Sequence, residues 1–408
     1  MKRMNTPLLG AQMLLVAFGA TTLVPLLTGI SPNLALLGAG IGTLIFQFCT
    51  KRQIPIFLGS SFAFIGPIIL GTQQFGLPAT LSGLMAAGVM FIIISGVVKL
   101  RGVKVIERFL PPVVVGPVIM VIGLGLAPVA VNMALGKTGD GSAVLVEQDI
   151  ALLISLAALF TTIVVSIFAK GMLKLMPIIC GVVVGYVLSL FFGLVDFSSV
   201  ANAAWFAIPE FVTPEFNWQA ILFIAPIGLI VTIEHFGDIL AISNVTGKNF
   251  VEKPGIHRSL LGDGLATITA ASFGAPPVVS YGEVTGAVSL LKTYNPVIMT
   301  WAAVFAIALA FVGKTGALLL SIPVPVMGGI MCLLFGAIAA IGLNTLISKQ
   351  VDLTIPRNLV IVSVTLVFGI GGMVVGIGEF TLKGVGLCGI LAIILNIVLP
   401  KEEAKALA

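Results

Sequence analysis

A short stretch in the second half of the chain, VTIEHFGDIL, holds three residue types that bind protons or hydrogen-bond donors. Glu234 and Asp238 are four residues apart, so on a helix their side chains share one face. His235, one of only 2 histidines, is turned away from Glu234 by about 100° around the same helix. The spacing predicts two carboxylates that work together and a histidine with a structural role elsewhere.

Four of the 16 acidic residues fall inside stretches that are otherwise apolar enough to span a membrane: Glu234, Asp238, Asp263 and Glu283. An ionised side chain at the centre of a bilayer costs about 2.5–3.5 kcal/mol on insertion scales. No lysine or arginine lies in the neighbouring apolar stretches to neutralise these acids. We therefore expect them to face a polar cavity, to hold protons, or both.

Each of these acids has a functional and a structural interpretation. Glu234 is expected to bind a ligand or the coupled proton, with capping of a broken helix as the alternative. Asp238 is either a second stop for that proton or a group that orients Glu234. Asp263, in LGDGLAT, lies toward the cytoplasmic end of its stretch, where we expect partial solvation and a role in coupling or in packing. A metal site from Glu234, Asp238 and His235 would have poor geometry, so no metal or cofactor is expected.

Glu283 follows PPVVSYG, where an extended segment is expected to give way to a helix. A helix N-terminus offers free N–H groups and partial positive charge, and Gly282 allows close approach to the backbone. Carboxylates that accept from N–H groups, together with backbone donors, suit a small, flat, neutral ligand with N–H and carbonyl groups. A carboxylate in an apolar cavity can also load and release a proton near neutral pH. Proton-coupled import is therefore the mechanism that these residues favour.

The composition identifies a membrane protein. Of 408 residues, 58% are hydrophobic and only 9% are charged, and the mean hydropathy is +1.19, whereas soluble domains carry roughly a quarter charged residues. The net charge of +5 is explained by basic loops facing anionic lipid rather than by nucleic-acid binding. The 4 cysteines are scattered within apolar stretches and do not form a disulfide or metal framework.

The breaks between apolar stretches predict an all-α polytopic membrane protein with about fourteen transmembrane segments, each near the roughly 20 residues that a bilayer requires. We expect them at residues 7–28, 33–50, 55–72, 77–98, 111–134, 149–169, 172–194, 218–245, 256–273, 276–291, 295–319, 325–346, 357–374 and 382–399.

The basic residues predict the orientation of these spans. If both termini are cytoplasmic and the spans alternate, all but three of the 21 lysines and arginines face the cytoplasm, as the positive-inside rule requires. The exceptions are Lys137, Lys314 and Lys383. This topology places both termini in the cytoplasm and the acidic and aromatic segment DFSSVANAAWFAIPEFVTPEFNW outside.

Seven spans in each half would leave the second half upside down relative to the first, an inverted repeat typical of transporters. We expect residues 1–197 to form the first repeat, 198–216 an extracytoplasmic linker, 217–400 the second repeat and 401–408 a cytoplasmic tail. LPPVVVGPVIM and IPVPVMGGIM open the fifth and twelfth spans. FLGSSFAFIGP and FGAPPVVSYGE occupy the third and tenth, where short extended segments in matching positions predict a binding site at mid-membrane.

Nearly the whole chain resembles the nucleobase–ascorbate transporter family, and within it the bacterial uracil permeases. The resemblance is carried by FGATTLVP, GTLIFQF, IPIFLGSSFAFIGP, IEHFGD, KPGIHRSLLGDGLAT, SYGE, IPVPVMGGI and VDLTIPRNL. It implies a core domain from spans one to four and eight to eleven, and a gate domain, commonly dimerising, from the other spans. Transport would occur by alternating access, with the core moving against the gate.

The resemblance also implies the residues that would form the substrate site. Glu234 and Glu283 would hydrogen-bond a nucleobase, and Phe62 would stack on it, while Gly282 would offer its backbone. Tyr281 and Ala20 would complete the core side of this pocket. Proton coupling would involve Glu234 together with Asp238, Asp263 and His235. Phe335 would line the pocket from the gate side, at a place where a uracil permease can have Tyr.

Two departures leave the choice of base open. Asp238 resembles the purine branch, because uracil permeases often have His there, and Val284 follows YGE where Asn is usual. YGE itself favours a pyrimidine, since purine members typically have Gln at the position of Glu283. Uracil is the favoured substrate and a xanthine-like purine the alternative. An anion transporter would require a buried cation at the site, and an intramembrane enzyme would require a nucleophile with a base, so neither is favoured.

Overall fold

The computed structural model describes residues 6–377 and 380–400, and most of them are helical. Seven helical stretches in this part are long and apolar enough to cross a membrane, and five further apolar helices are shorter. The seven long stretches are Thr6–Thr28, Pro32–Cys49, Leu77–Arg101, Pro112–Ala134, Gln148–Phe168, Trp218–Thr246 and Val324–Ser348. The predicted polytopic, helical membrane fold is therefore observed.

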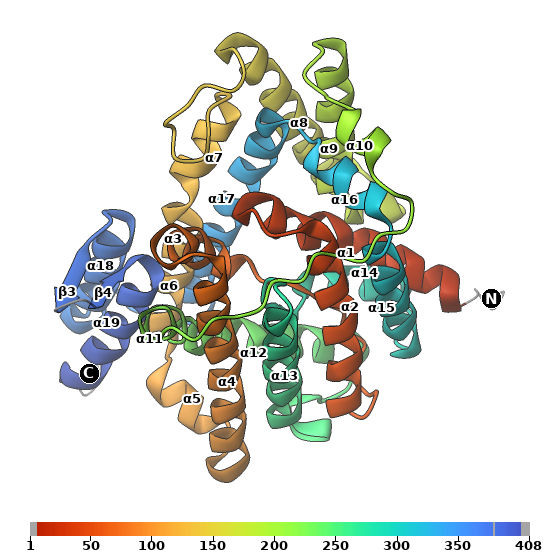
Figure 1. The fold of residues 1–408 in the computed structure, drawn as a ribbon. Coiled ribbons are helices and arrows are strands. Elements are labelled where there is room, and N and C mark those ends of the chain that lie inside the picture. Colours follow the sequence, from red (N-terminus) through yellow and green to blue (C-terminus); the bar gives the residue numbers. More distant parts are fainter. Residues whose placement is uncertain (1–5, 378–379, 401–408) are drawn as a thin grey trace.

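The helices pack into two groups, and each group draws on both halves of the sequence. In the first group, α13 lies against α4 and α2, while α15 packs on α1 and α2 (Figure 1). Its elements are α1 (Thr6–Thr28), α2 (Pro32–Cys49), β1 (Leu58–Ser60), η1 (Phe62–Phe64), α3 (Ile65–Phe75), α4 (Leu77–Arg101), α11 (Trp218–Ile224), α12 (Ile227–Thr246), α13 (Ile256–Ser272), β2 (Val278–Ser280), α14 (Gly282–Leu291) and α15 (Val297–Ala310).

The second group is centred on α17, which packs on α6, α7 and α8, with α18 and α19 beside α6. Its elements are α6 (Pro112–Gly125), α7 (Ala127–Ala134), α8 (Gln148–Phe168), α9 (Pro177–Phe191), α17 (Val324–Ser348), α18 (Pro356–Ile370) and α19 (Gly384–Val398). The short connecting elements are α5 (Lys104–Phe109), η2 (Gly171–Leu175), α10 (Ser198–Asn202), η3 (Val251–Gly255), α16 (Gly313–Leu320), β3 (Val374–Ile377) and β4 (Phe380–Lys383).

The two extended segments predicted in the third and tenth spans are present and pair with each other. β1 and β2 are antiparallel, with Leu58 opposite Ser280 and Ser60 opposite Val278, and all of their residues are buried. Pro276 and Pro277 lie just before β2, where proline removes backbone donors and disfavours a helix. The short sheet thus joins the two halves of the chain inside the first group.

Neighbouring helices satisfy the outer edges of this sheet, as non-helical backbone inside a membrane requires. Thr43 on α2 accepts the backbone N–H of Leu58 at 2.9 Å. Thr267 on α13 donates to the carbonyl oxygen of Val278 at 2.9 Å, and the Asp263 carboxylate accepts the backbone N–H of Ser280 at 3.0 Å. Thr43 of α2 and Thr267 and Asp263 of α13 therefore help to make the strands possible.

The predicted spans 111–134 and 218–245 each contain a break, between α6 and α7 and between α11 and α12. Two further differences concern the place where a helix ends. The predicted span 295–319 is wrong in its second half, because α15 ends at Ala310 and α16 begins at Gly313. The break is held by the linker, whose Ala207 N–H donates to the Phe311 carbonyl oxygen at 2.9 Å, and whose Val200 carbonyl oxygen accepts from Lys314 Nζ at 2.8 Å.

The second difference lies near the C-terminus. The helix predicted to run to residue 374 ends at Ile370, and β3 pairs with β4 as an antiparallel hairpin before α19 begins. Gly372 adopts a left-handed backbone (φ 71°) that turns the chain out of the helix. The expected cytoplasmic tail, 401–408, lies outside the described residues.

Candidate functional site

The candidate site begins at α12, whose residues divide between a buried and an open side. His235 is 1% exposed, whereas Glu234 is exposed and Asp238 half-buried. One helix thus buries its histidine in the first group and leaves its two carboxylates accessible.

His235 is held by a cluster of buried polar side chains. Its Nδ1 lies 2.7 Å from Oδ2 of Asp263 and 3.0 Å from the hydroxyl of Ser280. Its Nε2 lies 2.8 Å from the hydroxyl of Ser259. All four residues are at most 2% exposed, and His235 and Asp263 form a close acid–base pair. The predicted partial solvation of Asp263 is therefore wrong, because α13 packs that face against α12 and β2.

Asp263 and Thr267 together fix the position of β2. They lie four residues apart on α13, so both face the same strand, and they bond its backbone at Ser280 and Val278 respectively. The Asp263 carboxylate thereby connects His235 of α12 to the end of β2, immediately before Tyr281. The cluster of His235, Asp263, Ser259 and Ser280 therefore helps to hold β2 in position.

Aromatic side chains cover the junction of the two strands. The rings of Phe62 and Tyr281 are stacked, with centroids 6.3 Å apart and planes 18° apart. The Tyr281 hydroxyl donates to the carbonyl oxygen of Ser60 at 2.7 Å, and the Ser60 hydroxyl donates to the carbonyl oxygen of Thr21 at 3.0 Å. A Cβ at Gly59 would collide with the Tyr281 ring, so that position requires glycine. The structure thus brings the predicted residues Phe62 and Tyr281 together.

Asp238 lies at the start of α14. A Cβ at Gly282, the first residue of that helix, would lie 2.7 Å from Oδ1 of Asp238. The carboxylate therefore sits where a helix N-terminus favours negative charge. Glu283 is the second residue of α14, and its side chain lies outside the described part of the structure.

Ala20 and Phe335 are buried side chains that belong to different helix groups. Ala20 on α1 and Phe335 on α17 are each 2% exposed and belong to one continuous apolar cluster with Phe62 and Tyr281. At Gly123 on α6, a Cβ would meet the carbonyl oxygen of Phe335. Phe335 is thus positioned by close packing of α17 on α6, in the second group.

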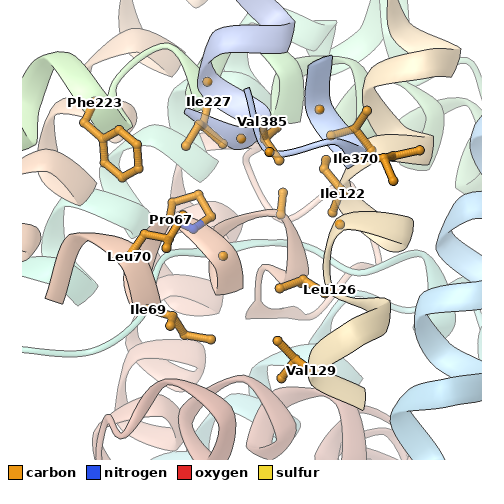
Figure 2. A pocket seen from close by; sticks show the side chains of 18 residues that line it. Pro67, Ile69, Leu70, Ile122, Leu126, Val129, Phe223, Ile227, Ile370 and Val385 are labelled. Carbon is orange, nitrogen blue, oxygen red and sulfur yellow. The ribbon is translucent and has the colours of Figure 1, made fainter. Parts of the chain in front are cut away.

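An apolar cavity of about 330 Å³ lies next to this region, between the two groups. Figure 2 shows Pro67, Ile69 and Leu70 of α3 on one side and Ile122 and Leu126 of the second group on the other. Its lining is entirely apolar and glycine-rich, so it provides no side-chain donor or acceptor for a polar ligand. The carboxylates of α12 and the strand ends therefore remain the candidate site.

Sequence reasoning missed several residues that build this site. Thr43, Ser259, Thr267 and Ser280 are buried and bond either the strands or His235. The sequence feature that could have identified them is a hydroxyl side chain in an apolar span, next to an extended segment whose backbone groups lack helical hydrogen bonds. No group of three metal-ligating side chains gathers within the described residues.

Comparison with known proteins places the chain among permeases. The profile of a family described as "Permease family" matches residues 4–377. A probable uracil permease of Pasteurella multocida is 56% identical over 97% of this chain and 93% of its own length. Uracil permeases of Bacillus caldolyticus and Escherichia coli are 46% and 41% identical, over 98% and 96% of this chain and 93% and 90% of their own lengths.

Solved structures with low identity share the fold. The transmembrane domain of a cyanobacterial bicarbonate transporter, BicA, has a TM-score of 0.68 at 15% identity and covers 96% of this chain and 97% of that chain. SLC26A9 has a TM-score of 0.73 at 10% identity, over 96% of this chain and 64% of that chain. At such identities the likeness concerns the fold alone.

Proposed function

The chain belongs to the nucleobase–ascorbate transporter family, and from this premise we propose that it imports uracil together with protons. Membership confirms the predicted family, and it confirms that the chain is a multi-pass membrane transporter rather than an enzyme. The observation that supports uracil as the substrate is the name uracil permease. Relatives that are 41–56% identical over more than nine-tenths of this chain share that name.

The candidate site suits a uracil ring. The exposed carboxylate of Glu234 accepts from a ring N–H, and the first backbone N–H groups of α14, at Gly282, donate to a ring carbonyl. The Phe62 ring, which stacks on Tyr281, is proposed to stack on the base, with Ala20 completing the pocket. Glu283 is proposed as the second carboxylate, and Phe335 closes the pocket from the second group.

Proton coupling is proposed to run through Glu234. Its side chain on α12 is exposed, and a bound base would replace the water that otherwise stabilises its charge. Asp238, one turn away, is the second stop for the proton. Asp263 and His235 lie behind β2, and we propose that their bonds shift when Glu234 and Asp238 change charge.

Movement of the first helix group against the second is the proposed transport step. The first group corresponds to the core domain and the second to the gate domain of fourteen spans in two inverted repeats, 1–197 and 217–400, joined by the extracytoplasmic linker 198–216. Interleaving of both sequence halves within each group supports this division. Both termini are proposed to be cytoplasmic, in a bacterial inner membrane.

The gate domain is proposed to form a homodimer within membrane lipid. Only 28% of the apolar stretch of α8 is buried, against 78% for α2. The gate group therefore offers an apolar surface that a second copy or lipid covers.

A competition experiment tests the substrate. Uptake of radiolabelled uracil is measured in a bacterial strain that lacks its own uracil transport and expresses this chain, with unlabelled uracil or xanthine in excess. We expect unlabelled uracil to abolish the signal and xanthine to leave it unchanged. Xanthine uptake that uracil does not displace would instead support the second candidate, a purine symporter. The observation that favours this candidate is the aspartate at position 238, beside Gly282.

A further inference from the structure

A second hollow, of about 540 Å³, lies outside the candidate site and is lined by polar and charged side chains. Arg52 comes from the connection between α2 and β1, while Lys248, Phe250, Glu252 and Lys253 come from the connection between α12 and α13. Pro296 adds the connection between α14 and α15. Each of these connections joins an element of the candidate site.

The hollow carries an excess of positive charge. Three cations and one carboxylate line it, and all four side chains are exposed. Within the described residues none of them forms an ion pair with a protein group. A concave surface with several unpaired cations concentrates positive potential and attracts anions, and lysine and arginine together suit the oxygens of a phosphate group.

The backbone that presents Arg52 is strained. Lys51 and Arg52 are consecutive residues other than glycine in the left-handed region, with φ of 55° and 53°, a conformation that side chains disfavour. Backbone bonds hold the turn, with the Arg52 N–H donating to the Gln47 carbonyl oxygen at 2.7 Å. Strain of this kind persists where the surrounding structure requires it, often at ligand sites.

The part of the hollow that comes from the connection between α12 and α13 is anchored to α12. Phe250 is 2% exposed, and its N–H donates to the hydroxyl of Ser243, a residue of α12, at 3.1 Å. Lys248 and Lys253 lie on either side of this anchor. Their position is therefore tied to the helix that carries Glu234 and Asp238.

We propose that this hollow is a binding site for a phosphate group, supplied either by an anionic phospholipid headgroup or by a soluble phosphate compound. Arg52, Lys248 and Lys253 hold the phosphate oxygens, and Glu252 limits the net charge of the hollow. A bound phosphate would link the connections that adjoin β1, α12 and α14. The site is thus placed to stabilise one arrangement of the substrate-binding elements.

The competing explanation is the general excess of basic residues on one side of a membrane protein. It predicts that removal of any three exposed cations on that side has the same effect. Lys170, Lys174 and Lys349 are exposed and lie in the second group or its connections, so their joint change to Gln is a matched control for charge.

Calorimetric titration of the detergent-purified protein with inorganic pyrophosphate at low ionic strength tests the proposal. We expect one site per chain, weakened at least tenfold in the Arg52→Gln, Lys248→Gln, Lys253→Gln triple variant and changed less than twofold in the control triple. Equal weakening in both triples, or no pyrophosphate binding by the unaltered protein, would overturn the proposal. Because this readout involves no transport, its failure is distinct from failure of the proposed function.

Competition then identifies the source of the phosphate. Displacement of pyrophosphate by short-chain phosphatidylglycerol, but not by short-chain phosphatidylcholine, would support the proposal with a lipid headgroup as the ligand. Displacement by a nucleoside monophosphate alone would support it with a soluble ligand. A phosphatidylcholine effect equal to that of phosphatidylglycerol would contradict it, because the zwitterionic headgroup carries no net charge.

Discussion

The two sides of α12 place polar side chains in different environments, one buried and one accessible. On the buried side, His235 has hydrogen-bonding partners at both ring nitrogens, and its carboxylate partner Asp263 is 0% exposed. On the open side, Glu234 and Asp238 are accessible beside the start of α14. The difference separates residues that hold the strands in place from residues that are available to a ligand.

This contrast gives different expectations for neighbouring positions on one helix. A buried pair that loses one member leaves the other desolvated and unpaired, which destabilises the fold. An accessible carboxylate that loses its charge should disturb the fold less, because water remains available to its neutral replacement. Stability and transport should therefore respond to different substitutions.

The largest effect is expected from Asp263→Ala. The change leaves His235 Nδ1 and the backbone N–H of Ser280 without their carboxylate partner, which costs about 3–5 kcal/mol of folding stability. Thermal unfolding of detergent-purified protein, with the yield of monodisperse protein, measures this loss. A variant as stable as the unaltered protein would remove the distinction between the two sides of α12.

Glu234→Gln is expected to have the next largest effect, on substrate binding and proton coupling rather than on folding stability. Loss of a hydrogen bond to a charged group costs about 1.5–3 kcal/mol, or roughly 10- to 150-fold in uracil affinity. Calorimetric titration with uracil measures the affinity, and thermal unfolding should show an unchanged midpoint. A drop in stability without loss of affinity would reverse the assignment of the two sides.

Tyr281→Phe tests the junction between the strands with a smaller expected effect. The variant keeps the ring that stacks on Phe62 but loses the hydroxyl that donates to Ser60, a loss of about 0.5–1.5 kcal/mol. The thermal midpoint should fall slightly, and Tyr281→Ala, which also removes the ring, should lower it further. Identical midpoints for the two variants would mean that the ring contributes nothing to the junction.

Asp140→Asn should have no effect on the pH dependence of transport. Hydrogen bonds from Thr138 and Ser142 lower the pKa of Asp140 from 3.8 to about 2. A lowered pKa adds stability that is present above the ordinary value and lost only as the pH falls toward about 2. Uptake profiles between about pH 5 and pH 8 should therefore coincide, and a shifted profile would place a coupling group outside the proposed site.

The sequence was sufficient for features that depend on local composition. Apolar runs of about 20 residues located most helices within a few residues of their observed ends. Glycine, serine and proline around Phe62 and Pro277 indicated the two extended segments. Glu234 and Asp238 were predicted to share one side of a helix because that follows from the helical period alone.

Features that depend on how distant helices pack were not predictable in the same way. The pairing of His235 with Asp263 requires the relative rotation of α12 and α13, which neither segment encodes by itself. A signal was nevertheless present, because a buried acid without lysine or arginine nearby leaves histidine as its hydrogen-bonding partner. The break at Gly313 and the hairpin of β3 and β4 likewise depend on contacts with other parts of the chain.

The central claim is that Glu234 couples uracil import to protons. Its most direct test is uptake of radiolabelled uracil into proteoliposomes with an inward proton gradient, with the gradient collapsed, and with Glu234→Gln under both conditions. We expect accumulation that requires the gradient in the unaltered protein and is absent in the variant. Equal uptake with and without the gradient, or gradient-driven accumulation by Glu234→Gln, would contradict the claim.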